Sequence, residues 1–430
     1  MAYSHVSRPE AATSSANVNV GWSLTDTVIY GAVMTTLIRD CFSAPVRYYT
    51  SDIPALWFIP DALMLASIML LCVQRNRFAF NVTAIIFISV SCVIGLSLNG
   101  STTAVASGLK MILPLFAGLY IGDRFKTGAS FKTTVLILYA AICLGVVYNS
   151  YFEFPWTDQT FLVGDQEREF SRVWWTATAD RIAGFGADSS LTGFLIMFSA
   201  VYLTSSSKIW TRFIVFGFTI YIIQITTSKT PIITIAALML IDIFCLMLGA
   251  IIGRSYQKVR VTLYWPVVII CTAAPFLAVL YGQTFGFGSN VSDNVYSFSV
   301  RAMTSWVTPH MLMLHDFPLG FLFGVGIGTV GYPVLFSNLA EWYDAMNQID
   351  NFPFSIYLLF GIPGFFIYLL LLYQLWWRGR ITARMDLVFM FLLYGITILG
   401  FGAATFCLFF GAILSPFAQK DSRFGSQSAS

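Results

Sequence analysis

Apolar runs of about 20 residues recur along the chain, most of them separated by short polar turns. A helix of that length spans the ~30 Å hydrocarbon core of a bilayer. The pattern therefore predicts an all-α polytopic membrane protein with about 11 transmembrane helices, within a range of about 10 to 12. The expected spans are 24–44, 54–73, 79–98, 104–121, 131–150, 190–206, 211–227, 230–252, 262–281, 354–376 and 387–412.

Two apolar stretches leave the number of spans open. Residues 317–337 are long enough to cross, but a full crossing would move the basic residues after the next span to the outer side. We therefore expect a re-entrant or surface-lying hairpin there, because irregular backbone is tolerated at membrane depth where protein buries it or it lines a cavity. The last stretch, 386–416, is compatible with one long span or two short ones.

Composition agrees with a membrane protein. Of the 430 residues, 57% are hydrophobic and 10% are charged, against roughly a quarter charged in soluble domains. The net charge of +3 is too small to indicate nucleic-acid binding. The seven cysteines lie mostly in apolar runs without metal-ligand spacing, so we expect packing residues. We expect one transmembrane domain over 23–416, with disordered tails at 1–22 and 417–430.

The distribution of charge predicts an orientation. Alternate short loops are basic, and by the positive-inside rule these loops and the N-terminal tail lie in the cytoplasm. The basic residues are Arg75, Arg77, Arg124, Lys126, Lys132, Lys208, Arg212, Arg254, Lys258, Arg260, Arg378, Arg380 and Arg384. The two long loops, 151–189 and 282–353, lean acidic and are therefore predicted outside. Within or close to the spans, Asp61, Lys110 and Asp242 are expected to form structural pairs or to line a pathway.

The first long loop ends in arginines and small residues. Arg172 lies near its end, and Arg181 precedes a run of small residues that leads into the next span. Helix N-termini attract phosphate, and arginine adds bidentate contacts, so this segment is a candidate phosphate site. The alternative is a loop arginine paired with Asp180 or Asp188. Lys229, in a short outer turn, is compatible with a snorkelling side chain or with a cation facing an anionic head group.

The second long loop gathers Arg301, Trp306, His310 and His315 before a glycine-rich apolar strip. The alternative to a site is an interfacial helix with a solvated arginine and histidines in ordinary polar contacts. The two histidines are five residues apart, on different helix faces, so we expect no metal site.

Four segments in this order resemble the signatures of the bacterial O-antigen ligase and polymerase superfamily, over about residues 165 to 375. They are "DRIAGFGADSSLTGFLIMF", "TTSKTPIITIAALM", "SVRAMTSWVTPHMLMLHDFPLGFLFGVGIG" and "DNFPFSIYLLFGIPGFFIYLLLL". Length and overall character are most similar to the xanthan-type exopolysaccharide polymerases. Ligases of this superfamily carry a histidine at the position of Asp350, so this difference favours a polymerase.

The resemblance implies a polysaccharide polymerase of the bacterial inner membrane, making an exopolysaccharide or O-antigen. It would join oligosaccharide repeats carried on undecaprenyl diphosphate, at the periplasmic face, as a metal-independent, inverting glycosyltransferase without a cofactor. Its partners would be the lipid-linked donor and acceptor, membrane lipids, a flippase and a chain-length co-polymerase, and not nucleic acid. The alternatives are a ligase of the same superfamily, a flippase or other transporter of lipid-linked oligosaccharides, and a cell-wall glycan polymerase of the rod-shape type.

The resemblance also implies roles for particular residues. Arg181 and Arg301 would stabilise the diphosphate leaving group, supported by Lys229 and Arg172. Asp350 would be the general base, with His310 or His315 as second choice. The groove around lipid and sugar would be lined by Trp306, Gly320, Gly324, Gly326 and Asn351. For Asp350 the alternative is an N-cap of the following helix.

Overall fold

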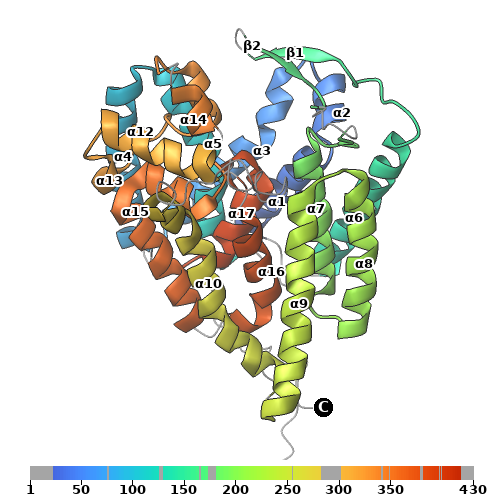
Figure 1. Ribbon diagram of the computed structural model, residues 1–430. Helices are drawn as coiled ribbons and strands as arrows, with labels where there is room; N and C mark the ends of the chain where they lie inside the picture. The colour runs from blue at the N-terminus through green and yellow to red at the C-terminus, as the bar shows by residue number, and fades with distance from the viewer. Residues whose placement is uncertain are drawn as a thin grey trace, which may run out of the picture.

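The computed structural model describes residues 23–74, 77–124, 129–163, 166–172, 181–253, 255–281, 302–339, 342–347, 349–377, 381–396, 398 and 400–417. Over these residues the protein is built from helices, with one small β-hairpin (Figure 1). The predicted tail 1–22, most of the tail 417–430 and Arg301 lie outside the described residues.

The first half of the chain forms a group of helices followed by the hairpin. The elements are α1 (Leu24–Cys41), α2 (Ser43–Tyr49), the 3-10 turn η1 (Pro54–Phe58), α3 (Ile59–Cys72), α4 (Phe78–Asn99), α5 (Thr102–Ile121) and α6 (Ala129–Asn149), then β1 (Thr160–Val163) and β2 (Gln166–Glu169). The two strands pair antiparallel, with Phe161 opposite Arg168. The hairpin is an addition to the all-helical architecture expected from the sequence.

The second half continues with α7 (Ser189–Thr204), α8 (Ile209–Ile225), α9 (Lys229–Ile252) and α10 (Tyr256–Tyr281). Short elements follow: the π-helical turn η3 (Met303–Val307), α12 (Thr308–Asp316), α13 (Gly320–Phe323), the 3-10 turn η4 (Tyr332–Phe336) and α14 (Tyr343–Asn347). The last elements are α15 (Phe352–Trp377), α16 (Ile381–Tyr394), the 3-10 turn η6 (Gly400–Gly402) and α17 (Ala404–Leu414).

Seven helical segments in the described part of the chain are long and apolar enough to cross a membrane. They are Pro54–Cys72, Phe78–Asn99, Thr102–Ile121, Ala129–Asn149, Lys229–Ile252, Tyr256–Tyr281 and Phe352–Trp377. Four shorter apolar helices, in α7, α8, α16 and α17, accompany them. The protein is therefore all-α with the character of a polytopic membrane protein, while the count of about 11 spans stays a prediction.

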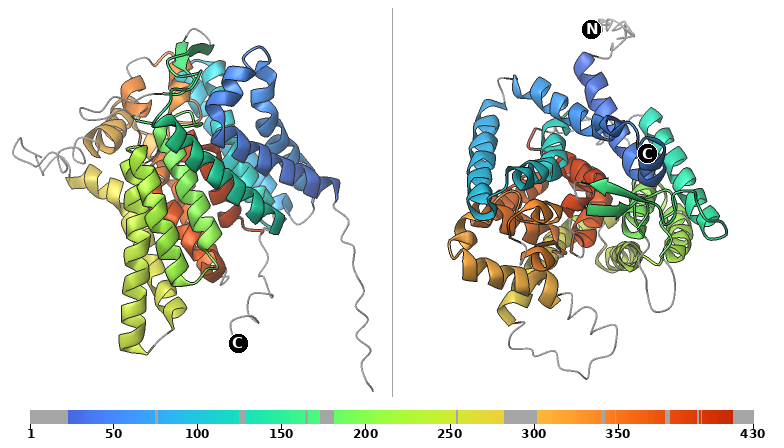
Figure 2. Two further views of the ribbon diagram at one scale, coloured as in Figure 1. Left: turned by 90° about the vertical axis from the view of Figure 1, so that its right-hand side faces the viewer. Right: turned by 90° about the horizontal axis from the view of Figure 1, so that it is seen from above.

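The two ends of the helical assembly differ. In Figures 1 and 2, α2, the β-hairpin, α12 and α14 gather at one end, which we call the loop end, and the α9–α10 turn lies at the opposite end. The described parts of both long loops thus lie together, away from that basic turn. This separation agrees with the alternation of loop charge along the sequence.

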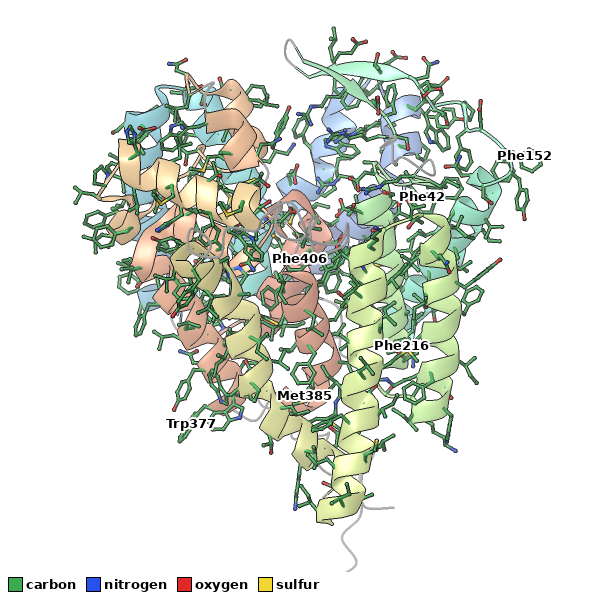
Figure 3. The ribbon with its side chains drawn as sticks, viewed as in Figure 1. Phe42, Phe152, Phe216, Trp377, Met385 and Phe406 are labelled. Atoms are coloured by element: carbon green, nitrogen blue, oxygen red, sulfur yellow. The ribbon has the colours of Figure 1, made fainter. Side chains whose placement is uncertain are left out.

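The C-terminal stretch 386–416 forms two short helices, α16 and α17, rather than one long helix. The sequence alone was compatible with both. Phe406 of α17 lies among rings from three other helices (Figure 3). Its ring centroid is 5.8 Å from Phe194 of α7, 5.1 Å from Phe391 of α16 and 5.3 Å from Phe352 of α15. This aromatic cluster fixes the starts of α7 and α15 relative to the end of α16.

The glycine-rich strip 317–337 is irregular rather than one continuous helix; residues 324–331 are buried, whereas Leu319 and Phe323 are exposed. Its backbone bonds to neighbouring helices: Val325 N–H donates to the Leu358 carbonyl (2.7 Å) and Ile327 N–H to the Ser91 carbonyl (3.0 Å). Gly326 has a φ of +82°, and a Cβ atom there would lie 2.5 Å from the Ser91 carbonyl oxygen. Burial between α4, α5 and α15 supplies the partners that such backbone needs within a membrane.

The charged residues predicted within spans are paired. Asp61 lies 3.0 Å from an Arg39 nitrogen and 3.7 Å from Lys110 Nζ. Asp242 belongs to a buried network with Arg212 at 2.8 Å, and this network also contains Arg260 and Asp386. Of the two readings, structural pair and pathway, these contacts favour the structural pair.

The glycine strip generates a stability prediction. Gly326→Ala forces an alanine into left-handed backbone, which costs ~1–2 kcal/mol, and overlap with α4 adds about 1–3 kcal/mol. We expect a clearly lower apparent Tm of the detergent-purified protein. Gly217→Ala in α8 is the control, because its added methyl group meets nothing within 4 Å. An unchanged Tm for Gly326→Ala would contradict the close packing.

Orientation is testable with single cysteines. Leu162 is 73% exposed on the hairpin at the loop end, and Lys258 is exposed near the opposite turn. We expect a membrane-impermeant maleimide to label Leu162→Cys in intact spheroplasts, and Lys258→Cys only after permeabilisation. The parent protein gives the background from its own cysteines. Labelling of Lys258→Cys alone in intact cells would reverse the predicted orientation.

Candidate active site at the start of α7

The start of α7 is organised by Asp188, its N-cap residue. The Asp188 carboxylate accepts a hydrogen bond from Leu191 N–H at 2.8 Å, and Arg172 N–H donates to the Ala187 carbonyl at 2.7 Å. Burial raises the pKa of Asp188, and the backbone N–H groups together with the nearby charges of Arg172 and Arg181 oppose that rise. Two of the three arginines predicted to bind phosphate, Arg172 and Arg181, therefore lie near one helix N-terminus.

Small residues let this segment fold tightly. Gly184 adopts a φ of +62°, and its N–H donates to the Asn149 side chain at 3.1 Å. A Cβ atom added to Gly193 would lie 3.2 Å from the Ser228 side chain and 3.0 Å from the Pro231 side chain, so α7 and the start of α9 are in close contact here. Lys229, the first residue of α9, therefore lies beside the start of α7 and has an exposed side chain.

Asp350 lies just before α15 and is held by its backbone. Trp306, fully buried in η3, donates from its indole nitrogen to the Asp350 carbonyl at 2.5 Å. The N-cap of α15 is Asn351, whose side chain accepts from Phe354 N–H at 2.8 Å and donates to the Ile396 carbonyl at 3.3 Å. The capping role considered for Asp350 thus belongs to its neighbour.

Tyr394, the last residue of α16, connects these two segments. Its hydroxyl donates to the Ser190 carbonyl in the first turn of α7 at 3.3 Å. The same phenol interacts electrostatically with both Asp188 and Asp350. Asp188 and Asp350 are far apart in sequence, but both lie near this tyrosine in the fold, and Arg172 and Arg181 lie near Asp188. Their juxtaposition is the candidate active site.

The two candidate histidines have different environments. His310 packs on α15, with its ring centroid 5.8 Å from that of Tyr357 and its Nδ1 3.5 Å from the Tyr357 hydroxyl. Burial lowers its pKa, so the imidazole is neutral at pH 7 and able to accept a proton. The His315 side chain is 85% exposed and lies 2.5 Å from Asp316. No contact within the described residues joins His315 to Asp350.

The glycines predicted to line a groove are in close contact with protein atoms. A Cβ on Gly320 would lie 2.6 Å from the Met313 side chain, and one on Gly324 would lie 2.5 Å from Phe360 N. Gly326 faces α4 in the same way. Close packing of backbone therefore accounts for all three glycines, and contact with a ligand groove stays a prediction.

Two site residues were missing from the predicted set. Asp188 appeared only as an alternative partner for an arginine, although its position before an apolar run is a typical N-cap signal. Tyr394 lies inside an apolar run, and no local pattern in the sequence connects it to residues 188 or 350. Only the packing of α16 between α7 and α15 reveals its place.

Comparison of the chain with protein-family models, with curated proteins and with solved structures finds no match. Membership of the O-antigen ligase and polymerase superfamily therefore stays a hypothesis that rests on the four sequence segments.

The assignment of the cap predicts a stability difference between two adjacent residues. Asn351→Ala removes the side chain that caps α15 and should cost ~1–2 kcal/mol. Asp350→Asn leaves that cap intact and should leave the apparent Tm of the purified protein close to that of the parent. A larger loss of stability in Asp350→Asn than in Asn351→Ala would assign the structural role to Asp350.

Proposed function

We propose that the protein is a polysaccharide polymerase of the bacterial inner membrane that joins lipid-linked oligosaccharide repeats at the outer face. The observation that carries the proposal is the arrangement at the loop end, where Arg172 and Arg181 lie near Asp188 at the start of α7, and Tyr394 lies near both Asp188 and Asp350. Two guanidinium groups and the carboxylate of Asp350, on segments that Tyr394 connects, match the needs of glycosyl transfer from a diphosphate. One group takes a proton from the acceptor, and the others stabilise charge on the leaving group.

The chemical step follows from this arrangement. The carboxylate of Asp350 accepts the proton of an acceptor sugar hydroxyl, and the hydroxyl oxygen attacks the anomeric carbon of the donor glycan. The bond between that carbon and the diphosphate oxygen breaks, and the undecaprenyl diphosphate leaves with the electron pair. Arg181 and Arg172 neutralise the developing charge through bidentate contacts. A direct displacement of this kind inverts the anomeric centre.

The surroundings support these roles. The Nε atom of Arg181 is buried and has no hydrogen-bond partner among the described residues. Lys229, exposed beside the start of α7, adds a third positive charge. His310 is the second candidate for the base, because it is neutral and half-buried. In this scheme guanidinium groups take the charge-stabilising role that a divalent ion has in other glycosyltransferases.

The alternatives predict different arrangements. A transporter is expected to expose charged residues along a path through the bilayer, whereas Asp61 and Asp242 are each bound by basic side chains. This supports an enzyme. A ligase of the same superfamily would use the same geometry but a different acceptor. Analysis of the reaction products therefore distinguishes a ligase from a polymerase.

The test is polymer synthesis by the purified protein supplied with a lipid-linked repeat. We expect a ladder of glycans on a gel, which persists in excess EDTA. Asp350→Asn should lower the rate by ~10²–10⁴-fold, and Arg181→Ala by ~10²–10³-fold. Arg181→Lys should rescue poorly, because the bidentate fork is lost. Lys132→Gln, an exposed change at the far end of α6, is the control that keeps the ladder.

Three results would contradict the proposal. A normal ladder from Asp350→Asn would remove that residue from the mechanism. Loss of activity in EDTA, restored by magnesium or manganese, would indicate a metal-dependent reaction. Transfer of a glycan to an acceptor other than another lipid-linked repeat, without a ladder, would identify a ligase.

A further inference from the structure

A second group of cations lies at the loop end, next to the candidate active site. Arg39 of α1, Arg47 of α2, Lys110 of α5 and Arg168 of β2 interact electrostatically with one another. This group is joined to the segment before α7, because Ala44 N–H of α2 donates to the Phe185 carbonyl at 3.1 Å. None of these four residues takes part in the mechanism proposed above.

Two of the four cations have acidic partners. Arg39 contacts Asp61 at 3.0 Å and Asp40 at 3.4 Å, and Lys110 lies 3.7 Å from Asp61. Asp40 also accepts hydrogen bonds from the backbone and the hydroxyl of Thr405, at 2.8 and 2.7 Å. Both carboxylates are therefore engaged by Arg39, Lys110 and the start of α17.

Arg47 and Arg168 are held by aromatic rings instead. The guanidinium carbon of Arg47 lies 3.9 Å from the centre of the Trp57 ring and 4.9 Å from that of Phe161. Arg168 lies 4.0 Å from the centre of Tyr332, and its buried Nε has no hydrogen-bond partner. No carboxylate among the described residues lies within salt-bridge distance of either arginine. The four cations therefore carry two uncompensated positive charges.

The pair is electrostatically unfavourable without an anion. Burial and the charges of Arg39 and Arg168 lower the pKa of Arg47 to about 10. An anion bound between Arg47 and Arg168 would relieve the repulsion between the two guanidinium groups. Stacking on aromatic faces fixes the plane of a guanidinium group and leaves its N–H edge for bidentate contacts with phosphate oxygens.

The surroundings indicate a lipid-borne anion. Around Trp57 the connection between α2 and α3 exposes apolar side chains, with Ile53 56% exposed, Phe58 48% and Ile59 42%. Apolar and aromatic side chains beside cations are typical of the interface between acyl chains and head groups. A phosphate group at Arg47 and Arg168 would then have an apolar path for its chain along η1 and α3.

We propose that Arg47, Arg168 and Lys110 bind the diphosphate of a second polyprenyl-linked substrate, the acceptor. This deepens the proposed function, on which the identity of the acceptor depends. A polymerase holds two lipid diphosphates at once, and a diphosphate that joins a lipid to a sugar carries about two negative charges, equal to the surplus at this site. The acceptor keeps its diphosphate during the reaction. It therefore needs a cation site apart from Arg172 and Arg181, which hold the leaving group.

The test counts binding sites for undecaprenyl diphosphate in nanodiscs, by equilibrium binding and native mass spectrometry. The parent protein should bind two molecules. The double variant Arg47→Gln/Arg168→Gln should weaken binding at the acceptor site by about 10- to 100-fold and leave the leaving-group site intact. Arg181→Ala should instead weaken binding at the leaving-group site. Lys110→Gln, whose side chain is 42% exposed, is a milder variant that should weaken the acceptor site if the double variant fails to fold. Lys132→Gln should still bind two.

Competition with inorganic pyrophosphate distinguishes a lipid from a free anion. We expect pyrophosphate to displace the lipid at least about tenfold less well than undecaprenyl diphosphate does, because it lacks the apolar chain. Equal competition would overturn the assignment to a lipid. A parent protein that binds only one lipid molecule would overturn the site itself. The same holds if the double variant and Lys110→Gln both still bind two lipid molecules. This readout requires no polymer, so two bound lipids without a glycan ladder would support the site while contradicting the polymerase.

Discussion

The requirement that polar groups be partnered inside an apolar assembly governs this structure. Arg77 is completely buried, and it donates to the Tyr120 carbonyl and to Asp123. Arg212 and Arg260 bridge Asp242 and Asp386 and so connect α8, α9, α10 and α16. Removing one partner of a buried pair costs ~3–5 kcal/mol, because the other charge stays unpaired. These pairs therefore fix which helices are neighbours, and the loop end is built on that frame.

Arginine side chains have different partners at the two ends of the molecule. In the network of Arg212, Arg260, Asp242 and Asp386, basic and acidic groups balance. At the loop end, by contrast, Arg47 and Arg168 stack on aromatic rings, and no carboxylate among the described residues lies within salt-bridge distance of either. The imbalance favours a loop end that binds anions and an opposite end that holds the helices together.

Hydropathy predicts most of this fold, because the length and composition of a helix are local properties. The expected span 79–98 corresponds to α4 over Phe78–Asn99, and 354–376 corresponds to α15 over Phe352–Trp377. The break between α16 and α17 was open, since an apolar sequence with glycines does not by itself reveal where a helix ends. Sequence motifs predict Arg181 and Asp350 as site residues, and their roles stay predictions. Tyr394 joins them only through tertiary packing, which no local pattern encodes.

The backbone of residues 325–327 has a consequence for biogenesis. Its N–H groups donate to carbonyls of Ser91, which is made earlier, and of Leu358 and Leu359, which are made later. The N–H groups of Val325 and Gly326 therefore lack these partners until α15 has been synthesised, whereas the partner of Ile327 is already present. The candidate active site forms after that step, because Asn351 caps the same helix. A chain truncated before α15 would present an unfinished, polar backbone to the bilayer, which is the kind of defect that membrane proteases remove.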